Sequence, residues 1–231
     1  MRLRRGTAGL LVVLLGLGLA GAGCSQEKKS GTNPRTVLAA AKRHLDTTSG
    51  VRLGLKADSL PTGVNGLLAA DGVGTHAPAF TGSIKVAVGG VNADAAVVAT
   101  GGKVYAKLPF TSKFTPINPA DYGAPDPADL LGRQGGLSSM LTSARDVKEG
   151  AQVRDGKRVL TRYTATVPGR TVAAIIPSAD SSAQFDATFT IDDQQRLAKA
   201  VLRGPFYPKA DDVRYTVTFD DYGTRRVIRA P

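Results

Sequence analysis

The sequence has little of what most catalytic and metal-binding sites are made of. It contains one cysteine, two histidines and no tryptophan. One cysteine cannot form a disulfide within the chain, and two histidines make a poor zinc ligand set. No Gly-x-Ser-x-Gly elbow is present, so a Ser-His-Asp hydrolase is not supported. We therefore expect no metal, no cofactor and no enzymatic activity.

Paired carboxylates are the remaining candidates for chemistry. They occur at Asp192-Asp193, Asp211-Asp212 and Asp220-Asp221. Each pair lies at the end of an expected strand, where aspartate commonly forms turns. Gly72-Val73-Gly74 is not a phosphate-binding loop, because no helix is expected after it. These groups are better explained as turn residues than as a calcium or catalytic site.

The only cysteine lies where an export signal would end. Met1–Arg5 is basic, Leu10–Leu19 is apolar, and small residues follow. That order is typical of a secretory signal, and the apolar run is shorter than the ~20 residues of a membrane-spanning helix. We interpret Gly21–Cys24 as a bacterial lipobox, which predicts a signal peptide over 1–23 and a lipid on Cys24. The alternative is a secreted protein with a chance free cysteine.

Lipidation would anchor the chain to the extracytoplasmic face of the cell membrane. Residues 24–34 are polar and predict a flexible tether, and 35–231 would form one β-rich domain. The three arginines of the signal have no acidic counterpart, so their removal lowers the formal net charge from +11 to +8. The basic residues are dispersed, which favours anionic headgroups over nucleic acid. A merely solvated basic surface is the alternative.

Hydrophobic periodicity predicts one helix followed by many strands. An apolar stripe recurs at helical spacing over 36–45, and Asn33 before Pro34 is a typical N-cap. Alternation then predicts strands joined by tight hairpins at Gly89-Gly90 and Asp155-Gly156. The expected strands are 51–57, 67–73, 80–88, 91–99, 103–108, 147–153, 158–167, 184–191, 196–203, 213–219 and 226–229. Three short helices are expected at 126–131, 136–141 and 168–176, and 114–127 is expected to be an irregular loop.

This series predicts an α+β, mostly β fold. We expect a single strongly curved antiparallel sheet of about ten or eleven strands, because so wide a sheet curls, with a few helices over its concave face. The inward residues are mostly alanine, valine and glycine, with phenylalanine only in places. Small inward residues leave room for a lined cavity. A filled core is the alternative that this pattern leaves open.

Several short pieces match a known family in order and spacing. Asp126-Pro127 precedes Leu130-Leu131, and Gly136-Leu137 precedes Met140-Leu141; Leu202–Phe206 follows later. Together they resemble the LppX/LprG family of actinobacterial lipoproteins. The resemblance implies a half-barrel, similar in shape to the LolA and LolB carriers. It also implies an apolar cavity that binds the acyl chains of a lipid or glycolipid and carries it across the cell envelope.

The resemblance raises the expectation that apolar residues of the helices and inner strands contact a ligand, although plain core packing is the alternative. The candidates are Leu38, Ala41, Leu45, Leu130, Leu131, Leu137, Met140, Leu141, Val172, Ile175, Ile176, Phe185 and Phe189. Expected partners are the acylated ligand, the membrane through Cys24, and an envelope transporter, with the protein itself a monomer. The rival hypothesis is a non-enzymatic scaffold lipoprotein with a filled core that acts through its basic surface.

Overall fold

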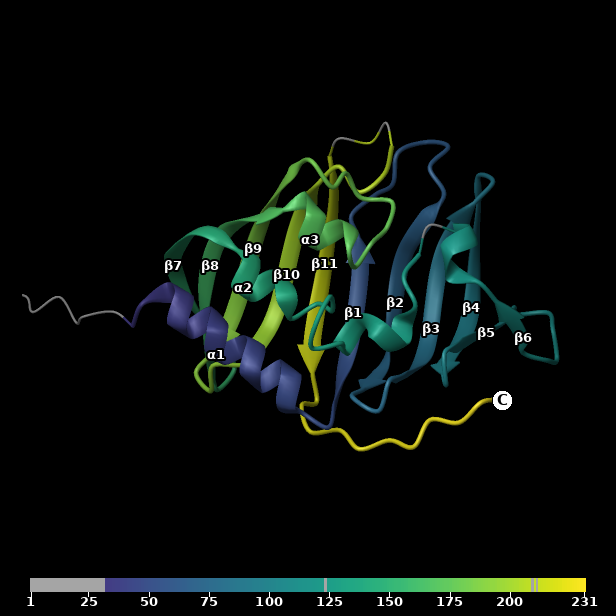
Figure 1. Cartoon of the computed structure of the whole chain (residues 1–231), viewed down its shortest axis with the longest axis horizontal. Coiled ribbons are helices and arrows are strands. Elements are labelled where there is room, and N and C mark those ends of the chain that lie inside the picture. Colours follow the sequence, from purple (N-terminus) through teal and green to yellow (C-terminus); the bar gives the residue numbers. More distant parts are fainter. Residues whose placement is uncertain (1–31, 123, 209, 211) are drawn as a thin grey trace, which may run out of the picture. The chain divides into compact units, whose positions relative to one another are not determined.

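The computed structural model describes residues 32–122, 124–208, 210 and 212–231 (Figure 1). The predicted signal peptide, Cys24 and the tether up to residue 31 lie outside the described residues. All described helices and strands belong to one compact unit, Thr32–Pro231. A shorter chain of residues 25–231 would therefore retain the whole unit. None of the helices in this unit is long and apolar enough to cross a membrane.

One open antiparallel sheet of eleven strands forms the unit. The strands are β1 (Gly50–Ala57), β2 (Gly66–Thr75), β3 (Ala79–Val88), β4 (Val91–Thr100), β5 (Lys103–Lys107), β6 (Thr115–Ile117), β7 (Arg145–Asp155), β8 (Arg158–Pro168), β9 (Gln184–Asp192), β10 (Leu197–Gly204) and β11 (Val213–Asp220). Their order is β6-β5-β4-β3-β2-β1-β11-β10-β9-β8-β7. The predicted half-barrel fold class is confirmed.

The strand order requires a long crossing. β1 and β11 pair at the centre, while β6 and β7 form the two opposite edges. The chain between β6 and β7 must therefore pass from one edge to the other, and it does so across one face. This crossover carries the 3-10 helices η1 (Pro119–Tyr122) and η2 (Pro127–Leu131) and the short helix α2 (Ser139–Ser143).

Helix α1 (Pro34–Thr47) covers one half of this face. Its N-cap Asn33 accepts a hydrogen bond from the backbone N–H of Arg35 at 3.0 Å, with Pro34 at the first helical position, as predicted. Its apolar stripe is buried against β7, β10 and α2. The third helix, α3 (Gly169–Ala173), packs on α2, β8 and β9. Figure 1 shows α1, α2 and α3 over the strands β7 to β11.

The buried side chains form two clusters of unequal size. The main core lies beneath α1, α2 and α3 and contains the fully buried Phe185, Phe189, Phe206 and Phe219. The smaller cluster lies on the other half of the sheet, where Phe80, Val97, Ala99 and Val104 pack with Ala128 of η2. The half of the sheet under α1 is therefore filled by aromatic side chains, and the other half is sparsely packed.

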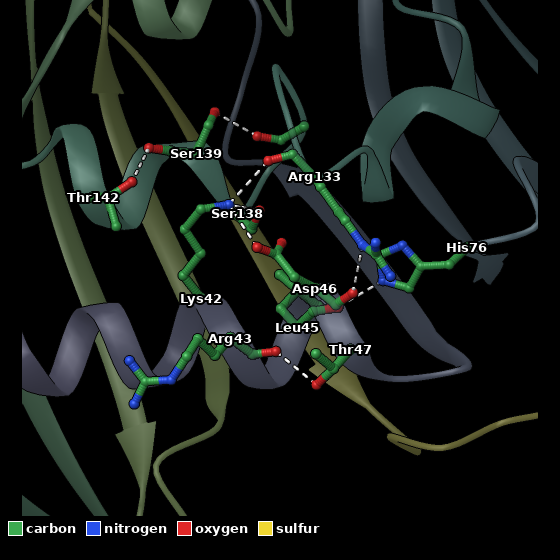
Figure 2. Close-up of polar contacts among 11 residues, drawn as sticks. Lys42, Arg43, Leu45, Asp46, Thr47, His76, Arg133, Ser138, Ser139 and Thr142 are labelled. Carbon is green, nitrogen blue, oxygen red and sulfur yellow. Dashed lines mark hydrogen bonds and ion pairs between the residues drawn. The ribbon is translucent and has the colours of Figure 1, made fainter.

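Lys42 ties α1 to the crossover (Figure 2). Its Nζ donates hydrogen bonds to Asp46 Oδ2 at 2.7 Å, to the Arg133 carbonyl at 3.0 Å and to Ser138 Oγ at 3.0 Å. His76, from the turn between β2 and β3, donates from Nε2 to the Leu45 carbonyl at 2.8 Å. These contacts hold the end of α1 against the crossover and against the first half of the sheet.

Two local predictions are wrong. Residues 114–127 were expected to be irregular but contain β6, which escapes sequence detection because Pro116 lacks an N–H and only an edge strand tolerates it. Residues 226–229 were expected to form a strand but have no regular structure. Both hydrogen-bonding sides of the preceding strand, β11, are already occupied by β1 and β10, so no edge is open to the C-terminal segment there.

Lys42→Ala is expected to lower the free energy of unfolding by about 1–2 kcal/mol, because Asp46 and Ser138 lose a partly buried hydrogen-bond donor. Arg43→Ala is the matched control, since Arg43 is exposed on the same helix, and we expect a change within about 0.5 kcal/mol. Urea unfolding of both variants measures this difference. Equal effects for the two would show that the Lys42 contacts do not secure the crossover.

Candidate functional site

An apolar cavity of about 560 Å³ lies over the sparsely packed half of the sheet. This volume is within the ~300–1,000 Å³ typical of ligand pockets. Strands β1 to β6 supply most of its floor, with Leu202 of β10 and Tyr215 and Val217 of β11, and the crossover with α3 supplies its roof. The space is therefore the hollow between the sheet and its covering segments in the region that α1 leaves open.

Alternation along three strands builds the floor. The inward residues are Phe80, Ile84, Val86 and Val88 of β3, Ala93, Ala95 and Val97 of β4, and Val104, Ala106 and Leu108 at β5. Successive side chains in a strand point to opposite faces, so each strand gives the cavity every second residue. On β9 the corresponding face carries Phe185 and Phe189, whereas β4 carries Ala93, Ala95 and Val97. The smaller side chains account for the empty space.

The roof is made by apolar residues of the crossover and of α3 and the turn after it. They are Leu130, Leu137, Met140, Val172, Ile175 and Ile176, with three prolines of the crossover, Pro119, Pro125 and Pro127. Nearby, η2 approaches the sheet closely because β2 carries glycine there. A Cβ on Gly74 would meet the Leu131 side chain at 3.0 Å, so the glycine makes room for the roof.

Exposure along the lining strands locates the mouth. On β3 the exposed fraction rises from 2% at Phe80 to 39% at Val88, and it rises from 5% at Val104 of β5 to 52% at Leu108, just after β5. Tyr122 of η1 also lines the cavity and is exposed. The cavity therefore opens where the β3–β4 hairpin, the segment after β5 and η1 meet the solvent.

Two tyrosines form the buried polar part of the wall. The hydroxyls of Tyr207 and Tyr215 lie 2.7 Å apart, and that of Tyr215 donates to the Leu67 carbonyl at 2.7 Å. Burial, together with the neighbouring Tyr207, raises the pKa of Tyr215 well above its ordinary value. The raised pKa keeps the Tyr215 hydroxyl protonated, and its hydrogen bond to Leu67 links β11 to β2 across β1 and braces the cavity.

A second, more open depression of about 630 Å³ adjoins the cavity. It shares Val104, Ile117, Leu130 and Ile175 with the cavity wall, but it also carries polar side chains. These are Lys103, Asn118, Asp126 and Asp129. This depression is therefore suited to polar groups, and the more enclosed apolar cavity is the better candidate for a specific apolar ligand.

The structure divides the thirteen predicted cavity residues into two groups. Leu130, Leu137, Met140, Val172, Ile175 and Ile176 line the cavity and also pack in or against the main core. Leu38, Ala41, Leu45, Leu131, Leu141, Phe185 and Phe189 are packed in the main core. Contact of either group with a ligand stays a prediction. Sequence reasoning did not single out the strand residues of the floor, although their alternation between 80 and 108 was the signal that could have identified them.

Comparison with known proteins gives concordant results. The model of the LppX_LprAFG lipoprotein family matches residues 33–227. The lipoarabinomannan carrier proteins LprG of Mycobacterium tuberculosis and Mycobacterium bovis are 30% identical over 196 residues, covering 78% of this chain and 78% of theirs. Among solved structures, LprF from Mycobacterium bovis superimposes with a TM-score of 0.71 at 14% identity, over 86% of this chain and 96% of LprF. The lipoprotein LppX from Mycobacterium tuberculosis gives 0.63 at 13% identity, over 85% and 98%. These two structures support the fold.

Tyr215→Phe is expected to lower the free energy of unfolding by about 1–2 kcal/mol, because Tyr207 and the Leu67 carbonyl lose a buried partner. Tyr105→Phe on β5 is the control, since among the described residues the Tyr105 hydroxyl makes no hydrogen bond, and little change is expected. Chemical unfolding near neutral pH measures both.

The same tyrosine predicts a loss of stability in alkali. The pKa of Tyr215 in the folded chain is higher than the ordinary value of 10.0, which applies to the unfolded chain. The hydroxyl therefore contributes its full share to the free energy of unfolding below pH 10.0, and this contribution falls as the pH rises above 10.0. Unfolding measured as a function of pH should show this fall in the parent protein and a shallower one in Tyr215→Phe. Identical alkaline profiles would contradict the buried position of the hydroxyl.

Proposed function

Because this chain belongs to the LppX_LprAFG lipoprotein family, we propose that it binds the acyl chains of a lipid or glycolipid in its apolar cavity and carries the lipid through the cell envelope. The observation that carries this proposal is the cavity of about 560 Å³ with its mainly apolar wall, in which Asn65, Thr115 and Asp121 are the polar side chains apart from the tyrosines. A cavity of this kind excludes charged or strongly polar ligands, because their desolvation would not be repaid by hydrogen bonds.

The energetics suit a carrier. Each CH2 group moved from water into an apolar site contributes about 0.8 kcal/mol. Acyl chains taken from a membrane are already shielded from water, so the net free energy of transfer into the cavity is small. A small net free energy allows both uptake and release without catalysis. The protein thus needs no reactive side chain, and we propose no enzymatic step.

The relatives narrow the ligand class. LprG is named a lipoarabinomannan carrier protein. In this chain the apolar cavity adjoins a depression with Lys103, Asn118 and Asp129 in its wall. We propose that acyl chains enter the cavity while the polar head remains at this depression or in solvent. A filled-core scaffold is less well supported, since the half of the sheet away from α1 is not filled.

The remaining predictions form part of the proposal. Cleavage before Cys24 and lipidation of Cys24 would anchor the domain to the extracytoplasmic face of the cell membrane through the tether 24–34. Donor and acceptor membranes, or an envelope transporter, would then lie within reach of a monomeric carrier. Mass analysis of the mature N-terminus tests the anchor independently of lipid binding.

Ala95→Phe tests the cavity directly. Ala95 faces the cavity from β4 and is 7% exposed, so a phenyl ring there would occupy the space for an acyl chain. Binding of a long-chain fluorescent fatty acid to residues 25–231 should weaken at least about tenfold, equivalent to about 1.4 kcal/mol. Ala96→Phe is the matched control, because the next residue on the same strand points to the opposite face.

The two variants separate the hypotheses. Loss of binding in Ala95→Phe, with Ala96→Phe close to the parent and both variants folded by circular dichroism, supports the carrier. Undiminished binding in Ala95→Phe would place the acyl chain elsewhere, and no binding by the parent protein would favour the scaffold.

A further inference from the structure

Large apolar side chains are exposed around the mouth of the cavity. Across the described residues the exposed large apolar side chains are Val88, Val91, Leu108, Phe110, Tyr122, Val153 and Val227. The first five come from the β3–β4 hairpin, the segment between β5 and β6, and η1. Phe110 is fully exposed, at 101%. We call Val88, Val91, Leu108, Phe110 and Tyr122 the rim.

The rim is continuous with the cavity wall. Val88, Leu108 and Tyr122 line the cavity and are exposed to solvent as well. Val91 pairs with Val88 across the hairpin, and Phe110 follows Leu108 by two residues. An apolar surface therefore runs from the interior of the cavity out to the tips of two loops. Exposed apolar surface of this kind marks an interaction site, since it costs free energy in water.

Two lysines flank the apolar tips of the rim. Lys107 and Lys113 belong to the segment that carries Leu108 and Phe110, and Lys107 lies 5.8 Å from the centre of the Phe114 ring. Of the nearby carboxylates, Asp94 pairs with Lys85 at 3.6 Å, whereas Asp121 accepts a hydrogen bond from the neutral Asn118 amide at 2.9 Å and keeps its charge. Apolar tips flanked by lysines complement a bilayer that carries anionic headgroups.

We propose that the rim docks on the surface of an anionic lipid bilayer, with Phe110 and Val91 entering the interface and Lys107 and Lys113 contacting headgroups. In this orientation the mouth faces the lipid, so an acyl chain passes between bilayer and cavity without crossing water. The inference rests on the proposed function for its purpose, but docking itself is measured without any ligand in the cavity.

Vesicle binding tests the proposal. Residues 25–231, which lack the acyl anchor, are mixed with vesicles of phosphatidylglycerol and phosphatidylcholine, and co-sedimentation is measured. The double variant Val91→Ser/Phe110→Ser should reduce partitioning at least about tenfold, because two apolar side chains no longer enter the interface. Val153→Ser/Val227→Ser is the matched control, since it removes exposed apolar side chains that lie on β7 and near the C-terminus, and it should bind as the parent does.

A second double variant tests the electrostatic contribution of Lys107 and Lys113 to vesicle binding. Lys107→Gln/Lys113→Gln should weaken binding to anionic vesicles and leave the weak binding to pure phosphatidylcholine unchanged. Added salt should weaken the parent more than this variant. An equal response of parent and variant to vesicle charge and to salt would overturn the assignment of these lysines to the docking surface.

Failure of docking and failure of the carrier function are distinguishable. The rim variant should bind a fatty acid supplied in solution normally, because neither substituted residue lines the cavity, yet it should extract lipid from vesicles slowly. Ala95→Phe should show the reverse, with vesicle binding kept and uptake lost. Co-sedimentation of the rim variant equal to that of the parent would overturn the proposal. So would light scattering that shows a dimer dissociated by the rim substitutions, because the rim would then contact a second copy.

Discussion

The route of the chain between the two edges of the sheet is the constraint on which the rest depends. Because β1 and β11 pair at the centre, β6 and β7 lie at opposite edges, and the segment between them must cross a face. That crossing covers the sheet with a long, proline-containing segment of short helical turns in place of a second long helix. It roofs the half that α1 does not reach, and contacts such as those of Lys42 hold it there.

The cavity then follows from a difference in side-chain size. Under α1 the inward face of β9 carries the fully buried Phe185 and Phe189. Phe185 also packs edge-on against Phe206, which follows β10 and borders the cavity, with ring centroids 4.9 Å apart. Under the crossover the inward residues of β4 are Ala93, Ala95 and Val97. One sheet thus supports both a filled core, which stabilises the fold, and a cavity, which lowers the stability because its lining lacks packing partners. Because a ligand would supply those packing partners, we infer that the cavity holds one.

Much of this architecture could be predicted from the sequence. Apolar and polar residues alternate along strands that have one solvent-exposed face, and glycine marks the hairpin turns. The strands, the N-capped first helix and the short helices of the crossover follow from local patterns. The edge strand β6 was missed because Pro116 opposes strand formation in general and is tolerated only at an edge. The expected strand at 226–229 failed because pairing depends on which neighbours β11 already has.

The candidate site was harder to predict, because the division between core and cavity is not local. Leu38 and Leu45 are as apolar as Leu130 and Leu137, yet α1 packs its leucines against β7 and β10, which are distant in the sequence, while the crossover turns its own toward the hollow. Only the three-dimensional position of each helix decides which leucine meets another side chain and which meets empty space.

The most direct test is native mass spectrometry of residues 25–231 after incubation with a lipid extract of a bacterial envelope, followed by identification of the released ligand. The account predicts a complex of one protein with one acylated lipid. A protein that keeps its bare mass throughout would contradict the central claim that the hollow beneath the crossover holds acyl chains.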